Sequence, residues 1–215
     1  MTLPVIVLGG AGHAKVLIST LLLQRRTILG FVDPKESIPT VLGVARLGGD
    51  EHVLLQDPSR IRLVNGVGSI GSTDLRRAVY DRFREKGYLF EQVIHPSAEI
   101  AFGVDGGDGL QVMARVVIQP GTRLGENVII NTGALVDHDC RIEAHVHIAP
   151  GVTLSGSVHI GSGAHVGTGA TIIQGIEVGE RSLVGAGAVV IRNVPAGMTV
   201  VGVPARPVKK QMQLR

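Results

Sequence analysis

The stretch from Ile94 to Val190 decides the fold, and its residues 158–184 read VHIGSGAHVGTGATIIQGIEVGERSLV. An aliphatic residue returns at every sixth position of this stretch, with Gly106 as the only exception. Neither a helix of 3.6 residues per turn nor the two-residue alternation of a strand produces a pure period of six. Each hexad therefore indicates a short strand followed by a turn. The residues in phase are Ile94, Ile100, Gly106, Val112, Ile118, Leu124, Ile130, Val136, Ile142, Ile148, Leu154, Ile160, Val166, Ile172, Val178, Val184 and Val190.

Two further positions of the hexad carry information. Small or aliphatic residues stand two places before the in-phase residue, as at Ala134 and Val146, and we expect them to fill the core beside it. A glycine often follows the in-phase residue directly, as at Gly125 and Gly161, and we expect a corner with positive φ there. Stacked hexads form a parallel β-helix whose neighbouring coils complete one another's core. Because the register never slips, no loop is predicted inside the coils, and a binding site needs walls from elsewhere.

The first ninety residues follow a different pattern, in which apolar strands alternate with helices. This alternation predicts a small parallel α/β domain of the Rossmann-like type. Ser72 or Thr73 is expected to cap its last helix. The predicted strands are 5–8, 28–32 and 62–67, and the predicted helices are 14–24 and 73–87. The predicted domains are an α/β domain over 1–92, a β-helix over 93–200 and a C-terminal tail over 201–215.

A glycine turn follows the first predicted strand, at Gly9-Gly10-Ala11-Gly12-His13. Such a turn lets the backbone approach a phosphate, and the helix N-terminus behind it offers free N–H groups. A G-x-G-x-x-G fingerprint would require glycine where Lys15 stands, so a nucleotide-sugar diphosphate is favoured over a dinucleotide. The residues predicted to bind it are Gly10, Ala11, Gly12 and His13.

Asp33 ends the second predicted strand, where a carboxylate can accept a hydrogen bond from a ribose or a base. The alternative is a turn aspartate beside Pro34, and the residues alone leave both interpretations open.

Composition narrows the class of protein. The chain has 215 residues, 44% of them hydrophobic, which is ample for a core. Its net charge of +3 comes from dispersed Lys and Arg with few aromatic residues, so nucleic-acid binding is not expected. Lys209, Lys210 and Arg215 are interpreted as a solvated tail or, at most, a contact for cofactor phosphates. The N-terminus has no basic leader and no apolar stretch is long enough for a bilayer, so a cytoplasmic protein without a membrane segment is expected.

Cys140 is the only cysteine, which excludes an internal disulfide framework. Its place two residues before Ile142 predicts an inward, buried packing thiol, and this interpretation is favoured over a catalytic nucleophile.

Several motifs together resemble one family. They are Gly9-Gly10-Ala11-Gly12-His13-Ala14-Lys15, Asn131-Thr132-Gly133, Val136-Asp137-His138-Asp139-Cys140 and Gly202-Val203-Pro204-Ala205. They are similar to the hexapeptide-repeat acetyltransferases that act on nucleotide-linked amino sugars in bacterial glycan synthesis, and to the related sialic acid O-acetyltransferases. The resemblance implies a left-handed β-helix with coils of about eighteen residues. It also implies acetyl-CoA as co-substrate and a homotrimer whose second subunit supplies part of the acceptor site.

The resemblance assigns roles to individual residues. It makes His138 the catalytic base and Asp139 the carboxylate that raises its basicity, and a histidine suits this work near neutral pH. It places His147, Thr168 and Ala186 in the acetyl-CoA groove, although an exposed corner imidazole, a surface threonine and a small turn residue are the alternatives. The bend over 197–204 resembles the terminus that closes this groove, where Arg206 or Lys209 would meet a coenzyme phosphate.

Other functions stay open at this point. His147 and His165 lie eighteen residues apart, so they should stack at about the strand separation of 4.8 Å. That pair invites comparison with the zinc carbonic anhydrases built on this fold, but the His-x4-His spacing of that family is missing, and groove residues or solvated side chains are favoured. No metal is expected. Sugar O-acetylation and a non-catalytic sugar-nucleotide-binding scaffold are the remaining alternatives.

Overall fold

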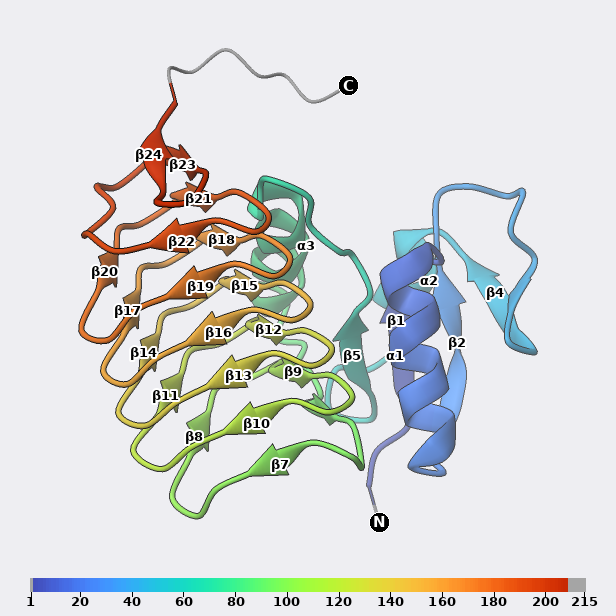
Figure 1. The fold of residues 1–215 in the computed structure, drawn as a ribbon. Coiled ribbons are helices and arrows are strands. Elements are labelled where there is room, and N and C mark those ends of the chain that lie inside the picture. Colours follow the sequence, from blue (N-terminus) through green and yellow to red (C-terminus); the bar gives the residue numbers. More distant parts are fainter. Residues whose placement is uncertain (1, 209–215) are drawn as a thin grey trace.

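The structure is a computed structural model that describes residues 2–208. It has an N-terminal α/β domain followed by a left-handed parallel β-helix, as predicted (Figure 1). The sheet of the α/β domain has the strand order β3-β4-β2-β1-β5, and all its pairs are parallel except the β3–β4 hairpin. Its elements are β1 (Val5–Leu8), α1 (Gly12–Leu23), β2 (Ile28–Val32), β3 (Thr40–Val41), β4 (Val44–Gly48), α2 (Asp50–Leu54), β5 (Arg62–Asn65) and α3 (Asp74–Arg84).

Two separate apolar clusters make this sheet the middle of three layers. Leu17 and Leu21 of α1 pack with Val7 and Phe31 on one face of the sheet. On the other face a second cluster gathers Tyr80 and Phe83 of α3 with strand and loop residues. Val93 and Met113 from the first coils join the α1 cluster, so the domain and the β-helix share part of one core.

The helices begin and end close to the predicted residues. α1 starts two residues earlier than expected, because Gly12 and His13 already belong to its first turn. Thr73 is the N-cap residue of α3, but its hydroxyl donates to the carbonyl of Gly163 in the β-helix (2.9 Å). Ser72 is the residue whose hydroxyl accepts from the first N–H of the helix, at Asp74 (3.1 Å). The short elements over 40–54 were not predicted, because a strand of two residues, a strand of five and a helix of five are too short to show a clear periodicity.

The β-helix consists of three stacks of two-residue strands joined at corners, and the coils rise from β7 to β24 in Figure 1. From β6 to β19, each strand pairs in parallel with the strand eighteen residues further on, as Ile129 does with His147, and β21 pairs with β23 sixteen residues on. The first stack contains β6 (Val93–Ile94), β9 (Gln111–Val112), β12 (Ile129–Ile130), β15 (His147–Ile148), β18 (His165–Val166), β21 (Leu183–Val184), β23 (Thr199–Val201) and the antiparallel β24 (Arg206–Pro207). The second contains β7 (Glu99–Ile100), β10 (Val117–Ile118), β13 (Leu135–Val136), β16 (Thr153–Leu154), β19 (Thr171–Ile172) and β22 (Val189–Val190). The third contains β8 (Asp105–Gly106), β11 (Arg123–Leu124), β14 (Arg141–Ile142), β17 (His159–Ile160) and β20 (Glu177–Val178).

The core of the β-helix confirms the six-residue pattern. The in-phase residues from Val112 onward are buried, and so are the small residues two places before them, including Cys140. Gly106 is the exposed exception, and Leu110 occupies the position that a side chain at Gly106 would take. The one break in the repeat is therefore filled from the same coil.

The corner glycines correct one expectation. Gly125 and Gly161, directly after an in-phase residue, do not have positive φ. They are glycines because an added Cβ would lie 2.5 Å or 2.6 Å from a backbone nitrogen of the next coil. Positive φ occurs instead three residues after the in-phase residue, at Gly103, Gly109, Arg115, Gly121, Asn127, Gly133, Asp139, His145, Gly151, Ser157, Gly163, Gly169, Gly175, Arg181 and Gly187.

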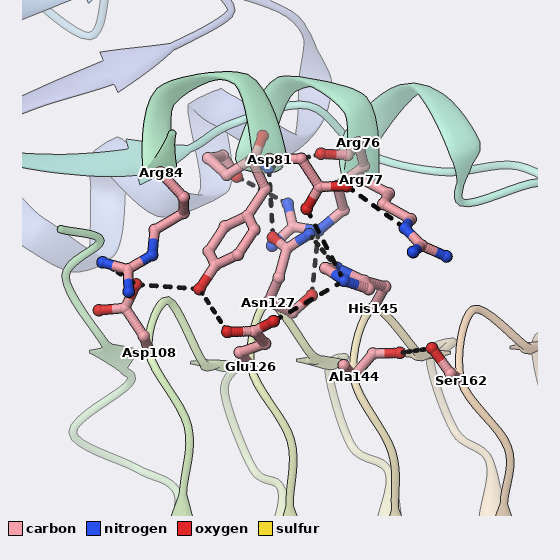
Figure 2. A network of polar contacts seen from close by, with 12 residues as sticks. Arg76, Arg77, Asp81, Arg84, Asp108, Glu126, Asn127, Ala144, His145 and Ser162 are labelled. Carbon is pink, nitrogen blue, oxygen red and sulfur yellow. Dashed lines mark hydrogen bonds and ion pairs between the residues drawn. The ribbon is translucent and has the colours of Figure 1, made fainter. Parts of the chain in front are cut away.

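The α/β domain covers the first stack of strands, and a polar network joins α3 to the coil corners (Figure 2). The Tyr80 hydroxyl lies 3.0 Å from both Asp108 Oδ2 and Glu126 Oε2, and it donates to one of them at a time. Nε2 of the buried His145 lies 4.0 Å from carboxylates on α3 (Asp81) and on the coil (Glu126). The position of the domain on the β-helix is thereby held by contacts specific to these side chains.

Over residues 2–208, no helix has the length and apolar character needed to cross a membrane.

Candidate functional site

His138 and Asp139 share a corner between β13 and β14. Asp139 takes the positive-φ position of its hexad (φ 58°), which turns its carboxylate back toward the preceding residue. His138 Nδ1 lies 2.8 Å from Asp139 Oδ2, and about half of the imidazole surface is exposed. Because a carboxylate only accepts, Nδ1 carries the proton and donates, and Nε2 keeps a free lone pair. The arrangement can take a proton from a group that approaches this corner.

The charges around His138 favour its protonated form. The hydrogen bond to Asp139 raises the pKa of the His138 imidazole above its usual value, and the nearby Asp137 carboxylate raises it further. Cys140, which follows, is buried in the core, and desolvation raises the pKa of its thiol. Its sulfur is thus a packing group, as predicted, and offers no activated nucleophile beside His138.

His147 and His165 lie on the strand face beneath the α/β domain, and their rings meet edge to face with centroids 4.9 Å apart. The stacking matches the expectation, but both side chains are buried, so neither is solvated. His147 lies on strand β15 and not at a corner. Ser69 Oγ lies 2.7 Å from His147 Nδ1, and the Asn131 amide nitrogen lies 3.1 Å from Nε2.

The partners of His147 assign its tautomer. Asn131 Oδ1 accepts from the backbone of Thr132, so its amide nitrogen faces His147 and donates to Nε2. Nδ1 therefore carries the proton and donates to Ser69. Burial lowers the pKa of His147 to about 3, with help from His165, His13 and Arg76. A contact between acetyl-CoA and Nε2 would have to replace Asn131.

His13 is held by a chain of hydrogen bonds that crosses from the α/β domain to the β-helix. Gln111, fully buried on β9, donates from Nε2 to the carbonyl of Asn65 (2.8 Å), which turns its Oε1 toward His13 Nε2 (2.7 Å). Burial and the positive charge of Arg76 lower the pKa of His13 to about 4, so the ring is neutral near pH 7. Nε2 then carries the proton, and Nδ1 is a hydrogen-bond acceptor.

Arg76 is the buried cation of this region. Its Nη1 donates to the carbonyls of Asn65 and Val67 (both 2.8 Å), and it lies fully inside the protein. Its Nη2 has no partner among residues 2–208, and desolvation lowers the pKa of its guanidinium to about 9. Arg76 fixes the loop that carries Ser69, and its charge opposes protonation of His13 and His147.

Asp33 holds the glycine turn in place through hydrogen bonds. Asp33 Oδ2 accepts from the Gly10 backbone N–H (2.7 Å), and Oδ1 accepts from that of Lys35 (2.8 Å). A Cβ at Gly10 would lie 2.6 Å from Phe31 Cε2, so this position needs glycine for close packing. Ala11 is the N-cap residue of α1, and Gly12 is exposed with open space around it. The predicted diphosphate-binding turn is therefore an accessible helix N-terminus.

The other predicted residues lie at some distance along the coil. Thr168 and Ala186 are exposed and occupy stacked corners after β18 and β21. His138 occupies a different corner, after β13, and the second stack of strands separates the two sets of corners. Arg206 is exposed on β24, whereas Lys209, Lys210 and Arg215 lie outside the described residues. One chain thus does not bring Thr168 and Ala186 next to His138.

Three residues of the site were not predicted. Ser69 and Gln111 contact histidines across the border between the two domains, and Asn131 contacts His147 within the β-helix. The Asn131-Thr132-Gly133 motif gave no sign of this contact. Gln111 has one sequence signal: it precedes His147 by thirty-six residues, two coils, and so belongs to the same strand row. Within residues 2–208, no three His, Cys, Asp or Glu side chains are close enough to hold a metal ion together.

Family comparisons agree with this architecture. The family described as "PglD N-terminal domain" matches residues 4–83. Two hexapeptide families match the coils, "Bacterial transferase hexapeptide (six repeats)" over 122–156 and "Hexapeptide repeat of succinyl-transferase" over 157–192. The chain thus combines a PglD-type N-terminal domain with the hexapeptide repeats of transferases.

Solved structures resemble nearly the whole chain. PerB from Caulobacter crescentus, in complex with CoA and GDP-perosamine, is 39% identical with a TM-score of 0.88, over 96% of this chain and 97% of that one. The acetyltransferase domain of PglB from Neisseria gonorrhoeae, in complex with acetyl coenzyme A, is 35% identical with a TM-score of 0.90, over 95% and 98%. WeeI from Acinetobacter baumannii is 28% identical with a TM-score of 0.80, over 96% and 100%.

The chain is a hexapeptide-repeat acetyltransferase, an enzyme that uses acetyl-CoA as its co-substrate. Within that class it belongs to the family of nucleotide-amino-sugar N-acetyltransferases and sialic acid O-acetyltransferases.

Proposed function

We propose that this enzyme transfers the acetyl group of acetyl-CoA to the amine of a nucleotide-linked amino sugar, such as a UDP- or GDP-linked 4-amino sugar, in bacterial glycan biosynthesis. The observation that carries the proposal is the His138–Asp139 pair, which presents a free Nε2 lone pair on an exposed corner. PerB, 39% identical, binds CoA and GDP-perosamine, and a perosamine N-acetyltransferase from the same organism is 38% identical.

His138 is the general base of the proposed reaction. The amine nitrogen forms a bond to the thioester carbonyl carbon, and His138 Nε2 takes the proton that this nitrogen gives up. The carbon–sulfur bond breaks, and its electron pair leaves with the sulfur of CoA as a thiolate. Asp139 holds Nδ1–H and stabilises the imidazolium that forms. No acyl-enzyme is needed, because the amine attacks the thioester directly, and the only thiol of the chain, Cys140, is buried.

The α/β domain provides the acceptor site in this proposal. The backbone N–H groups of Gly12 and His13 at the start of α1 meet the diphosphate, with Gly10 and Ala11 forming the turn. Asp33 holds the turn and is proposed to accept a hydrogen bond from the ribose or base with its remaining lone pairs. His147, Thr168 and Ala186 are proposed to line the acetyl-CoA groove, with Arg206 near its end.

A homotrimer is proposed because one chain does not assemble the whole site. The outward positions of the third stack are all charged or titratable: Asp105, Arg123, Arg141, His159 and Glu177. The outward positions of the second stack are neutral after Glu99. Leu135 is exposed, and Val117, Thr153, Thr171 and Val189 are half-buried. A shallow hollow on this face is lined by Leu135 and Thr153 and reaches Asp137, beside His138. A second copy seated there would bring its own groove residues to His138.

The proposal is tested by thiol release from acetyl-CoA with a panel of UDP- and GDP-linked 4-amino sugars and CMP-sialic acid. The parent should turn over one amino sugar, and His138→Ala should lose about a hundred- to ten-thousand-fold of that rate. His159→Ala is the matched control, because His159 is also partly exposed beside a carboxylate, Glu143, but lies on the charged face. Turnover only on a hydroxyl acceptor would move the assignment to O-acetylation. Full activity of His138→Ala would contradict the proposed base.

The trimer has a separate test. Leu135→Asp places a carboxylate in the middle of the neutral face and should dissociate the oligomer and abolish turnover, while Arg123→Asp on the charged face should keep both. Native mass spectrometry measures the oligomer, and circular dichroism checks that each variant is folded. A parent that is monomeric at working concentration would refute the proposed assembly.

A further inference from the structure

One corner position of the β-helix is unusual at Gly156. The second residue after the in-phase residue begins each corner, and between Ala114 and Ala186 this position is occupied by Ala114, Pro120, Glu126, Thr132, His138, Ala144, Pro150, Gly156, Ser162, Thr168, Gln174, Glu180 and Ala186. Gly156 is the only glycine among them and the only buried residue. Its φ is not in the left-handed region, so the backbone does not require glycine.

The His138 imidazole explains the glycine. An added Cβ at Gly156 would lie 2.6 Å from both Cε1 and Nε2 of His138, and 3.2 Å from Cδ2. Those three ring atoms are the nearest neighbours of that position, and no backbone atom is closer. His138 and Gly156 are eighteen residues apart, so the ring lies directly on the corner of the next coil. Elsewhere this corner accepts a Cβ without difficulty, as at Ala144 and Ala186.

Asp139, the partner of His138, also packs against a glycine of a neighbouring coil. A Cβ at Gly121, eighteen residues before Asp139, would lie against Asp139 Oδ1, the oxygen that does not bond to His138. Gly121 has positive φ, so its backbone conformation also favours glycine. At Gly156 the backbone does not, so steric contact with the side chain of His138 is the only reason for glycine there. The backbone hydrogen bonds between these stacked corners are intact. Ser157 N–H donates to the His138 carbonyl (2.8 Å), and Gly175 N–H donates to the Gly156 carbonyl (3.0 Å).

We propose that Gly156 is a positioning residue for the reaction: the bare backbone of the next coil supports the His138 ring so that Nδ1 meets Asp139 while Nε2 faces the acceptor. The inference rests on the proposed function of His138. A methyl group at this place would tilt the ring away from Asp139 and cover Nε2. It would leave the fold unchanged, because alanine already occupies the equivalent corner in other coils.

Gly156→Ala is the direct test. We expect kcat to fall about 10- to 100-fold, within the range that a general base contributes, with KM for acetyl-CoA and for the amino sugar changed less than twofold. Gln174→Ala is the matched control, because Gln174 is exposed at the same corner one coil further on, and it should keep kcat within twofold. Equal thermal unfolding temperatures would show that both variants are folded.

A double variant separates positioning of His138 from any other effect. If Gly156 acts through His138, then His138→Ala combined with Gly156→Ala should be no slower than His138→Ala alone. An additional tenfold loss in the double variant would overturn the inference, as would unchanged kcat in Gly156→Ala.

A readout that does not depend on turnover keeps this test distinct from that of the proposed function. The pKa of His138, followed by NMR titration, should fall in Gly156→Ala because the ring leaves Asp139, and it should not change in Gln174→Ala. If His138→Ala retained activity, the proposed base would be wrong, yet the NMR shift would still show that Gly156 positions the His138 ring. An unchanged pKa of His138 in Gly156→Ala would refute that positioning role.

Discussion

Histidines occupy two opposite environments in this protein. His138 lies at an exposed corner of the β-helix, whereas His147 lies on the face of the β-helix that the α/β domain covers, here called the covered face, with His13 of α1 in contact with it. His138 is half exposed beside two carboxylates, which raise its pKa. His13 and His147 lie at the contact between the α/β domain and the β-helix, near the buried Arg76, and burial lowers their pKa values to about 4 and about 3. A histidine that titrates near neutral pH can move a proton, whereas one that stays neutral serves as a fixed donor and acceptor. The raised pKa of His138 suits the proton transfer proposed for it, and the lowered pKa values of His13 and His147 suit fixed hydrogen bonding.

The largest effect expected from this difference is on stability in acid. Below the unfolded value of about 6.5, the unfolded chain takes up protons that folded His13 and His147 do not, so stability falls as pH drops toward their folded pKa values. We expect a loss of about 3–5 kcal/mol between pH 7.5 and 4.5, measured by urea unfolding. For His138 the sign is reversed, because its raised pKa stabilises the fold at low pH and that contribution is lost as pH rises.

Two variants test the signs separately. His147→Gln should flatten the pH dependence of the unfolding free energy by about one proton, because one site of differential uptake is removed. His138→Gln should leave the pH dependence of the unfolding free energy unchanged or make it slightly steeper. An unaltered slope in His147→Gln would show that His147 titrates normally in the folded protein.

Arg76 should give the next largest effect. Arg76→Met keeps most of the volume but leaves the carbonyl of Val67 without its side-chain donor and that of Asn65 with Gln111 alone, and we expect a loss of about 2–4 kcal/mol in unfolding free energy. Removal of the positive charge should also raise the pKa of His13, which NMR can follow. Arg77→Met, at an exposed ion pair with Asp81, is the control and should cost less than about 1 kcal/mol. Equal losses in the two variants would contradict a special role for the buried cation.

The period of six predicts the β-helix because each hexad repeats one local geometry. It places His138 and Asp139 two and three residues after Val136, where every corner lies, but it does not fix their exposure, because Asn127 and His145 at equivalent corner positions are buried. The positive-φ position was assigned to the wrong glycines, because close approach of the next coil also demands glycine and the sequence letters do not distinguish the two causes.

The local sequence pattern does not predict the contacts of the covered face. His147 and His165 stack as their spacing predicts, but their burial depends on where the α/β domain sits. The bond between His13 and Gln111 joins residues ninety-eight positions apart, and only the tertiary structure brings them together. The same holds for Gly156, whose meaning appears once the coils are stacked on His138.

Asp139→Asn tests the corner side of the comparison. An amide still fills the space but no longer favours the imidazolium, so we expect kcat/KM at pH 7.5 to fall about 10- to 100-fold. The pKa of His138 should fall as well, so the acid limb of the pH–rate profile should move to lower pH. Asp137→Asn should produce a smaller shift of the same sign, because Asp137 lies next to His138 but bonds to its backbone N–H. A profile in Asp139→Asn that keeps the parent's acid limb would mean that another group titrates.

Gln111→Met tests the covered face and has the smallest expected effect. The variant removes the acceptor that holds His13 Nε2–H, so the neutral ring can exchange its tautomer and Nδ1 is no longer always an acceptor. If His13 receives a hydrogen bond from the nucleotide sugar, KM for that substrate should rise about 3- to 10-fold, since one neutral hydrogen bond contributes about 0.5–1.5 kcal/mol. KM for acetyl-CoA and the acid limb set by His138 should stay as in the parent. Long-range nitrogen–proton NMR spectra report the tautomer directly, and Gln174→Met at an exposed corner is the control. A parallel rise in both KM values would indicate a general loosening of the domain contact, and an unchanged tautomer would mean that Gln111 does not orient His13.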